Sequence, residues 1–370
     1  MTGSGYDLVV VGGGLIGAAI AWGASRTGAS VALLDEGDVA YRASRGNFGL
    51  IWLQGKGVGK PAYMHWSLRA GRLWKDLAEE LHAATGLDTG WRQTGGLHFC
   101  FSEAELDKRR DVLARSQADG GEITMQFLDR TALRDLVPEI GPEVVGASFS
   151  PEDSHVSPLY LLRALQQALQ DGGGSYRPGI AVNEIRPEVG GFAVATPTGS
   201  VHGRRIVLAA GLGSARLAPQ LGLSMPVEPE RGQIVVTERV RPCFPYAANC
   251  LRQTAEGSFL FGSSHEEAGF DEGTQVATAA DLCATALRVL PGLQAAGVVR
   301  IWGSLRVMTP DGLPIYEESS RYPGAFAATC HSGVTLASVH AFDIGPAIAA
   351  GALPAAVASF GSGRFDVQAT

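Results

Sequence analysis

The N-terminal glycine pattern constrains the fold of this chain more than any other feature. Tyr6–Val11 is a short apolar run, as expected for a strand that is buried on both faces. Small residues over Ala18–Arg26 predict a helix, and Ser30–Leu34 predicts a second buried strand. Between the first strand and the helix lies the spacing G-x-G-x-x-G, at Gly12, Gly14 and Gly17. This order predicts a βαβ unit that binds a dinucleotide.

Each glycine of the motif has a physical task. Gly12 permits the tight turn, Gly14 lets a pyrophosphate approach the backbone, and Gly17 lets the helix pack closely on the strand. Free N–H groups at the helix start, near Leu15 and Ile16, are expected to hold the pyrophosphate. Asp35 ends the second strand, where its carboxylate can accept hydrogen bonds from ribose hydroxyls. An acid at this point disfavours NADP, because it would repel the 2′-phosphate.

Composition narrows the class of protein further. The net charge of -7 argues against a nucleic-acid partner, which would require a basic surface. The 5 cysteines are scattered and include no C-x-x-C pair, so we expect neither a disulfide framework nor a metal site. The N-terminus lacks a signal-peptide pattern, and no apolar run reaches the ~18 residues of a membrane span. We therefore expect a cytoplasmic protein with at most peripheral membrane contact.

The rest of the chain predicts an α/β fold with α+β elements. Apolar spacing predicts helices over Trp66–Leu81 and Val334–Ala350, and residues 227–263 alternate like an antiparallel sheet. Ile180–Ile185 is predicted to be a strand. With no flexible linker visible, two interleaved domains are expected: a Rossmann-like FAD-binding domain over 1–85, 152–220 and 300–370, and a smaller substrate domain built on an antiparallel sheet over 86–151 and 221–299.

The motif alone does not separate FAD from NAD, but three later segments resemble parts of the D-amino-acid oxidase and glycine oxidase family of flavoproteins. The segment from Asp35 to Gly49 resembles the one that carries the flavin half of FAD. Val207–Gly211 resembles the strand and turn near the adenine. His331–Leu336 resembles the turn that aims a helix N-terminus at the flavin ring, where it stabilises negative charge. The resemblance implies FAD contacts from Glu36, Ser44, Arg45, Asn47, Gly49, Leu50, Val182, Ala210, Gly211, Arg306, His331, Ser332, Gly333, Val334 and Thr335.

A further likeness concerns the substrate. Gly303–Pro314 resembles the family's Arg…T-P-D-G-x-P segment, whose arginine clamps the substrate carboxylate in members that oxidise amino acids. This implies that Arg306 binds a carboxylate through its planar fork, although a structural arginine is the alternative. The resemblance implies that a small amino acid or secondary amine (a D-amino acid, or a compound like D-hydroxyproline, sarcosine or glycine) is oxidised at its C–N bond by hydride transfer to flavin N5, giving an imine. The catalytic pocket is expected to draw on Arg306, His331, Phe48, Tyr246 and Arg252, with Trp52, His265 and His155 as further candidates.

Two departures from the family refine these expectations. The segment before T-P-D contains no cysteine of the kind that attaches FAD in some members, so non-covalent FAD is expected. The strand Ser258–Gly262 lacks the lysine that oxygen-using sarcosine oxidases place over the flavin. This favours a dehydrogenase that passes electrons to a quinone or a partner subunit over an oxidase that uses O2.

Arg45–Gly57 looks most like bacterial D-hydroxyproline dehydrogenases and related opine-oxidase and hydrogen-cyanide-synthase subunits. The likeness implies cyclic or N-substituted amino acids as substrates and a homo- or hetero-oligomer. Two other hypotheses remain open: an NAD-dependent dehydrogenase, and a non-catalytic flavin subunit that only relays electrons. All of the flavin assignments require that Gly14 and the turn at His331 meet at one cavity.

Overall fold

The βαβ unit predicted from the glycine motif lies at the centre of the larger sheet, in a computed structural model that describes residues 5–37 and 43–366. Strand β1 spans Tyr6–Val11, helix α1 spans Leu15–Ser25, and strand β2 spans Val31–Leu34. Side chains of β1 alternate between two hydrophobic cores. Leu8 and Val10 join the core that contains α1, whereas Val9 and Val11 face the opposite side. Burial on both faces explains the unbroken apolar run.

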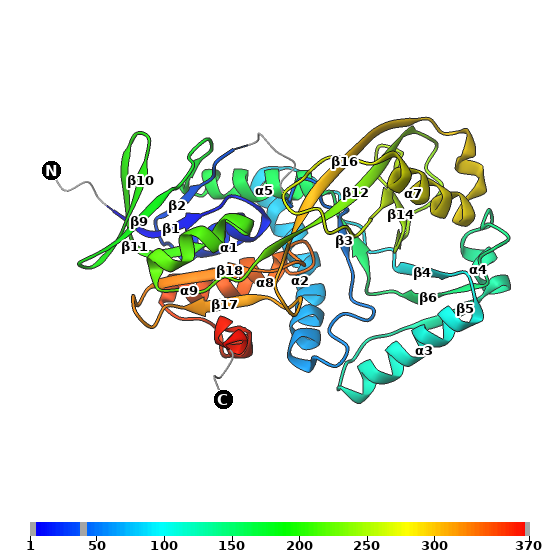
Figure 1. Cartoon of the computed structure of the whole chain (residues 1–370), viewed down its shortest axis with the longest axis horizontal. Helices are drawn as coiled ribbons and strands as arrows, with labels where there is room; N and C mark the ends of the chain where they lie inside the picture. Colours follow the sequence, from blue (N-terminus) through cyan, green and yellow to red (C-terminus); the bar gives the residue numbers. More distant parts are fainter. Residues whose placement is uncertain (1–4, 38–42, 367–370) are drawn as a thin grey trace.

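The larger sheet is mixed and is covered by helices on the α1 face. Its central order is β17-β18-β11-β1-β2-β8, with β10 and β9 attached to β11. β1 pairs in parallel with β2 and β11, and β11 pairs in parallel with β18. Helices α2 and α5 pack on the same side as α1 (Figure 1). The bounds are β8 Ser175–Arg177, β9 Glu184–Glu188, β10 Gly191–Thr196, β11 Gly199–Leu208, β17 Ile315–Glu318, β18 Ala325–Thr329, α2 Pro61–Thr85 and α5 Pro158–Asp171.

A second sheet provides the antiparallel part of the fold, in the order β14-β15-β12-β16. Its two long strands, β12 and β16, run side by side from near the larger sheet toward α7 (Figure 1). The domain boundary expected at residue 300 falls within β16, which pairs with β12 in this sheet. The bounds are β12 Glu228–Arg239, β14 Leu251–Gln253, β15 Ser258–Gly262, β16 Val298–Met308 and α7 Val276–Val289.

The remaining elements form a third sheet, in the order β13-β4-β6-β5, and a small pair of strands, β3 and β7. The mixture of a parallel Rossmann-like sheet and antiparallel sheets confirms the predicted α/β fold class with α+β elements. The bounds are β3 Leu50–Ile51, β4 Gly96–Cys100, β5 Gln126–Asp129, β6 Gly146–Ser150, β7 Ser154–His155, β13 Ala247–Ala248, α3 Glu103–Ala118 and α4 Arg130–Leu136.

Two predicted elements differ from the structure. Residues 180–183 form no strand, because Ile180 donates its N–H to the Asp35 carbonyl at 2.7 Å outside any ladder. The predicted helix at Val334–Ala350 begins three residues later: turns precede α8 (Ala337–Val339), a π-helical turn covers His340–Ile344, and α9 spans Gly345–Ala350. In both places the sequence is apolar because its side chains line a cavity, and the backbone there forms no regular strand or helix.

No single helix within the described ranges is long and apolar enough to cross a membrane. One bent pair, Ala337–Ala350 and Ala355–Phe365, meets the test of length and composition with an angle of 101° between its halves. Val339 and Ile344 of this pair are fully buried in the protein core.

We expect stability to fall as the pH drops, because two core histidines are buried in their neutral form. Burial lowers the pKa of His155 to about 4 and that of His340 to about 3. The unfolded chain protonates near pH 6.5, so each histidine removes up to about 1.4 kcal/mol of stability per pH unit below that value. Urea unfolding midpoints at pH 7, 6 and 5 should decrease, and His155→Gln should flatten the slope. His82→Gln, at an exposed position, should leave the slope unchanged. A slope in His155→Gln equal to that of the wild type would contradict this account.

Candidate active site

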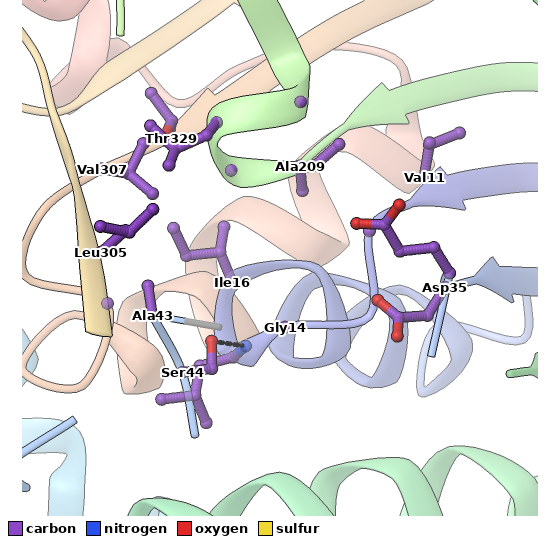
Figure 2. A pocket seen from close by; sticks show the side chains of 18 of the residues that line it. Val11, Gly14, Ile16, Asp35, Ala43, Ser44, Ala209, Leu305, Val307 and Thr329 are labelled. Carbon is purple, nitrogen blue, oxygen red and sulfur yellow. Dashed lines mark hydrogen bonds between the residues drawn. The ribbon is translucent and has the colours of Figure 1, made fainter. Parts of the chain in front are cut away.

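A cavity of about 630 Å³ opens at the carboxyl end of β1. Figure 2 shows Val11 and Asp35 at one end and Leu305 and Val307 at the other, with Gly14 between them. The carboxyl end of parallel strands is the usual place for a nucleotide in this type of fold.

The glycines allow backbones to meet where no side chain would fit. A Cβ on Gly17 would lie 1.9 Å from the Gly12 carbonyl oxygen, so α1 packs directly on the turn that follows β1. Gly12 itself has a φ of +106°, and a Cβ there would lie 2.3 Å from the Ala209 carbonyl oxygen. Both glycines are therefore required by close backbone contacts. Gly12 lines the cavity, whereas Gly17, also predicted to contact the cofactor, does not.

Asp35 and Ser44 organise two neighbouring parts of the cavity, one suited to a ribose and the other to a phosphate. The Asp35 carboxylate accepts the Gly13 N–H at 2.7 Å and the Gly37 N–H at 3.0 Å, which fixes it beside the glycine turn. Each carboxylate oxygen retains a lone pair for a ribose hydroxyl. The Ser44 hydroxyl accepts the Leu15 N–H at 2.9 Å (Figure 2), and the first turn of α1 carries no acidic side chain. The helix start is thus suited to an anion.

The C-terminal turn reaches the same cavity. His331, Gly333 and Val334 line it together with Gly14 and Ile16. A Cβ on Gly333 would lie 3.5 Å from Cγ1 of Ile16, so the two glycine-rich segments nearly touch. The meeting of Gly14 and the turn at His331, which the flavin assignments require, is therefore present.

A second cavity of about 360 Å³ adjoins the first and shares Ala43, Asn47, Val307, Cys330, His331 and Val334 with it. Phe48, Trp52 and His265 line the second cavity, as do Leu50, Arg306, Ser332 and Thr335. A ring system held at the shared wall would face both spaces. The larger cavity suits a dinucleotide and the smaller one a compact substrate.

Arg306 lies across the neighbouring strand at Gly232, where a Cβ would be 2.6 Å from its Nη2. Its Nη1 donates to Glu230 Oε1 at 2.8 Å, and its Nη2 donates to Ser263 Oγ at 2.6 Å. Burial lowers the pKa of Arg306, and the Glu230 charge opposes that shift. The fork is therefore preorganised, but most of its donors already serve protein acceptors.

Two histidines that line the smaller cavity, the half-buried His98 and His331 at the more exposed turn, are neutral. Burial, together with the charges of Lys56 and Arg306, lowers the pKa of His331 to about 3. Burial and the Arg109 charge lower the pKa of His98 to about 4. At neutral pH both rings can donate or accept a hydrogen bond without carrying charge.

Two residues predicted to be catalytic lie outside both cavities. Tyr246 packs edge-on against Phe149 and Phe244, at the hydrophobic core that the second and third sheets share. Arg252 is buried and donates from Nε to the Phe48 carbonyl oxygen, so it holds the loop instead of facing a ligand. We therefore correct both assignments: neither side chain is placed to contact a substrate. His155 is likewise buried away from the cavities.

The loop from Ala43 to Leu50 is clamped from several sides. Gly46 accepts the Trp302 indole N–H at 3.2 Å and leaves no room for a Cβ against Ser304. Gly49 has a φ of +91° and packs on the Val156 carbonyl, so it lies outside the cavity walls. Arg45 also lines neither cavity. Of the remaining predicted contacts, the larger cavity is lined by Gly12, Leu15, Asp35, Glu36, Ser44, Asn47, Val182, Ala210 and Gly211.

Sequence reasoning did not assign three residues that the fold brings to the site. Lys56 and His98 line the smaller cavity, and Cys330 lies at the wall common to both. Burial raises the pKa of the Cys330 thiol to about 12, which keeps it protonated and weakly nucleophilic. Cys330 lies next to the recognised turn and Lys56 within the recognised stretch Arg45–Gly57, whereas His98 carried no signal in the sequence.

Comparison with known proteins agrees with this geometry. The family model of FAD dependent oxidoreductases (DAO) matches residues 7–344, and the chain belongs to that family. It is 43% identical to an opine oxidase subunit from Agrobacterium tumefaciens (strain Ach5) over 98% of both chains, and 41% identical to the corresponding opine oxidase subunit from Rhizobium meliloti over 98% of both. Glycine oxidase from Geobacillus kaustophilus has a similar structure, with a TM-score of 0.89 at 26% identity over 96% of this chain and 98% of that one.

The protein is thus an FAD-dependent oxidoreductase of a family that acts on C–N bonds. The larger cavity fits the cofactor: the start of α1 would hold the pyrophosphate, Asp35 the ribose, and the turn at His331 the flavin ring.

Replacing Gly12 with Ala should abolish FAD retention, because the new methyl group would clash with the Ala209 carbonyl in a strained backbone conformation. The ratio of flavin absorbance to protein absorbance after purification measures this loss. Gly361→Ala is the matched control, since a Cβ there meets no atom within 4 Å. Normal flavin content in Gly12→Ala would contradict the assigned phosphate turn.

Proposed function

We propose that this enzyme oxidises the C–N bond of a small amino acid whose amine is secondary, a class that includes N-substituted and cyclic amino acids. The observation that carries the proposal is the second cavity, which combines an arginine fork, neutral histidines and apolar walls beside the flavin end of the first. The names of the relatives support it, because opines are the stated substrates of the two proteins at 43% and 41% identity.

Bound FAD would supply the acceptor for a hydride from the carbon next to the amine nitrogen, and loss of the N–H proton would complete the two-electron oxidation to an imine. Arg306 would orient the substrate by its carboxylate, with Glu230 and Ser263 holding the guanidinium in place. His331, which is neutral, would hold an amine or carbonyl group by hydrogen bonding without adding charge. Trp52 and Phe48 supply apolar wall that excludes water.

We further propose that the FAD is bound without a covalent bond and that electrons leave to a quinone or a partner subunit. The protonated Cys330 thiol is a poor nucleophile, which supports the first point. β15 contains no lysine, so the sequence argument against fast reaction with O2 stands. A D-hydroxyproline-like substrate remains one member of the proposed class.

A partner subunit would find a suitable surface at the start of β16. This strand is the edge of its sheet, and Val298 and Val299 expose 50% and 63% of their surface, with Ile301 at 37%. An exposed apolar edge strand is prone to pair with another chain. We propose a chain of different sequence as the occupant, because both opine oxidase relatives are named as subunits.

The purified protein should be yellow, and a secondary-amine amino acid should bleach the flavin in the absence of oxygen. Arg306→Met should weaken carboxylate substrates roughly 10- to 100-fold, since a charge-assisted hydrogen bond contributes about 1.5–3 kcal/mol. Anaerobic titration with proline analogues, sarcosine, glycine and D-amino acids measures both effects.

Because removal of Arg306 leaves Glu230 without its partner, Arg306→Met/Glu230→Gln serves as the control for local repulsion. Weak binding should persist in the double variant. A flavin that no amine bleaches would reject the proposed reaction and favour a subunit that only relays electrons, whereas retention of NAD without flavin would reject the cofactor.

Val299→Lys should release the partner, because it places a charge in the centre of the apolar edge. The measurement is the mass of the complex purified from the native source, where we expect a second chain in fixed proportion to flavin. Val189→Lys, at a fully exposed hairpin position, should keep that complex. A wild-type chain found alone, or only with copies of itself, would contradict the proposed occupant.

A further inference from the structure

Lys56 is a cation that lines the smaller cavity and has no acidic partner in the described part of the chain. Its ammonium donates to Ser332 Oγ at 2.7 Å. Within residues 5–37 and 43–366, no carboxylate lies within ion-pair distance of Lys56. Lysine is rarely left partly buried without a counter-charge, because desolvation of an ammonium is costly. The cavity therefore favours a ligand that brings negative charge.

Hydrogen bonding at Ser332 points the same way. Its hydroxyl oxygen accepts from Lys56 and also from the Tyr63 hydroxyl at 2.9 Å. The hydroxyl hydrogen of Ser332 meets no acceptor in the described part of the chain. Lys56 retains further N–H donors as well. This corner of the cavity thus offers several donors and needs acceptors from a ligand.

The location of these donors separates them from the nucleotide. Lys56 and Ser332 line the smaller cavity and do not line the larger one, although Cys330, His331 and Gly333 do. Arg306, the other cation of the smaller cavity, is already balanced by Glu230. Two cationic groups therefore serve one small space, and only one of them has an acid beside it.

The position of Lys56 is built into the fold. Its N–H donates to the Leu53 carbonyl at 3.0 Å in a tight turn. Below that turn, the buried Asp153 carboxylate accepts the Gln54 side-chain amide at 2.7 Å and the backbone N–H groups of Leu53 and Gln54. Gln54 in turn accepts Arg109 Nη2 at 2.9 Å. A loop held by this many buried bonds presents Lys56 in one place.

We propose that Lys56 and the Ser332 hydroxyl bind a second carboxylate of the substrate, the first being held by Arg306. The preferred substrate is then a secondary amine with a carboxylate on each side of the nitrogen. This inference rests on the proposed function and narrows its substrate class.

Matched ligands that cannot be oxidised at a C–N bond test the inference directly. Thiodiacetate has a carboxylate on both sides of a sulfur atom, and methylthioacetate has only one. Isothermal titration of the FAD-loaded protein should show that Lys56→Met weakens thiodiacetate roughly 10- to 100-fold and leaves methylthioacetate within about twofold. Lys56→Arg should restore part of the loss, and Lys60→Met, in the same loop but exposed, should change neither.

Three results would overturn the inference. An equal loss of affinity for thiodiacetate and methylthioacetate would mean that Lys56 binds any carboxylate in the cavity. No loss of affinity for either would mean that Lys56 takes no part in binding. A shift of the flavin midpoint potential or of the rate of reoxidation by O2 in Lys56→Met, with ligand binding unchanged, would assign the charge to the flavin. If instead no amine bleaches the wild-type flavin while thiodiacetate still discriminates, the proposed reaction fails and the anion site stands.

Discussion

The site depends on one backbone contact, the packing of Gly17 on the Gly12 carbonyl. That contact brings α1 close enough to β1 for its N-terminus to open directly on the cavity. A side chain at either position would push the helix away and turn its free N–H groups from the phosphates. Because β1 is central in the sheet, the same contact fixes the helix relative to β2, β11 and β18. The adenine, phosphate and flavin parts of the cavity are all positioned relative to that fixed point.

The antiparallel sheet has a different part in the proposed site, since it carries Arg306 to the smaller cavity. β12 and β16 pair over nearly their full length, and the cavity end of the pair carries Arg306 opposite Glu230. Gly232 leaves the space in which the guanidinium lies. Arg252 and Gly46 then fasten the loop that lies between the two sheets. A rigid strand pair positions a charged fork more accurately than a loop would.

Charge is distributed unevenly around the smaller cavity. Arg306 has its own carboxylate, whereas the side chain of Lys56, among the residues that the structure describes, is bonded only to a hydroxyl. Both charges lower the pKa of His331, after the larger effect of burial, and so keep that ring neutral. A neutral ring that shares the cavity with two cations adds no charge to their mutual repulsion. The resulting positive charge suits the dicarboxylate substrate that we propose.

The sequence by itself determined the nucleotide-binding unit, because its signals are local. The bounds of β1 matched the prediction. Most of the residues predicted from the three motifs that resemble the flavoprotein family line one of the two cavities. The apolar pattern wrongly predicted a strand at residues 180–183 and a helix start at Val334. In both places apolar side chains face a cavity. Arg252 and Tyr246 carried suitable chemistry, but Arg252 is buried against the Phe48 carbonyl and Tyr246 packs in an aromatic cluster, so neither lines a cavity. Only the tertiary structure brought Lys56 beside Ser332 and placed Glu230 on Arg306, since the sequence does not encode contacts between distant segments in any local pattern. Backbone geometry is dictated by neighbours along the chain, whereas the balance of charge in a cavity is decided by which segments meet there.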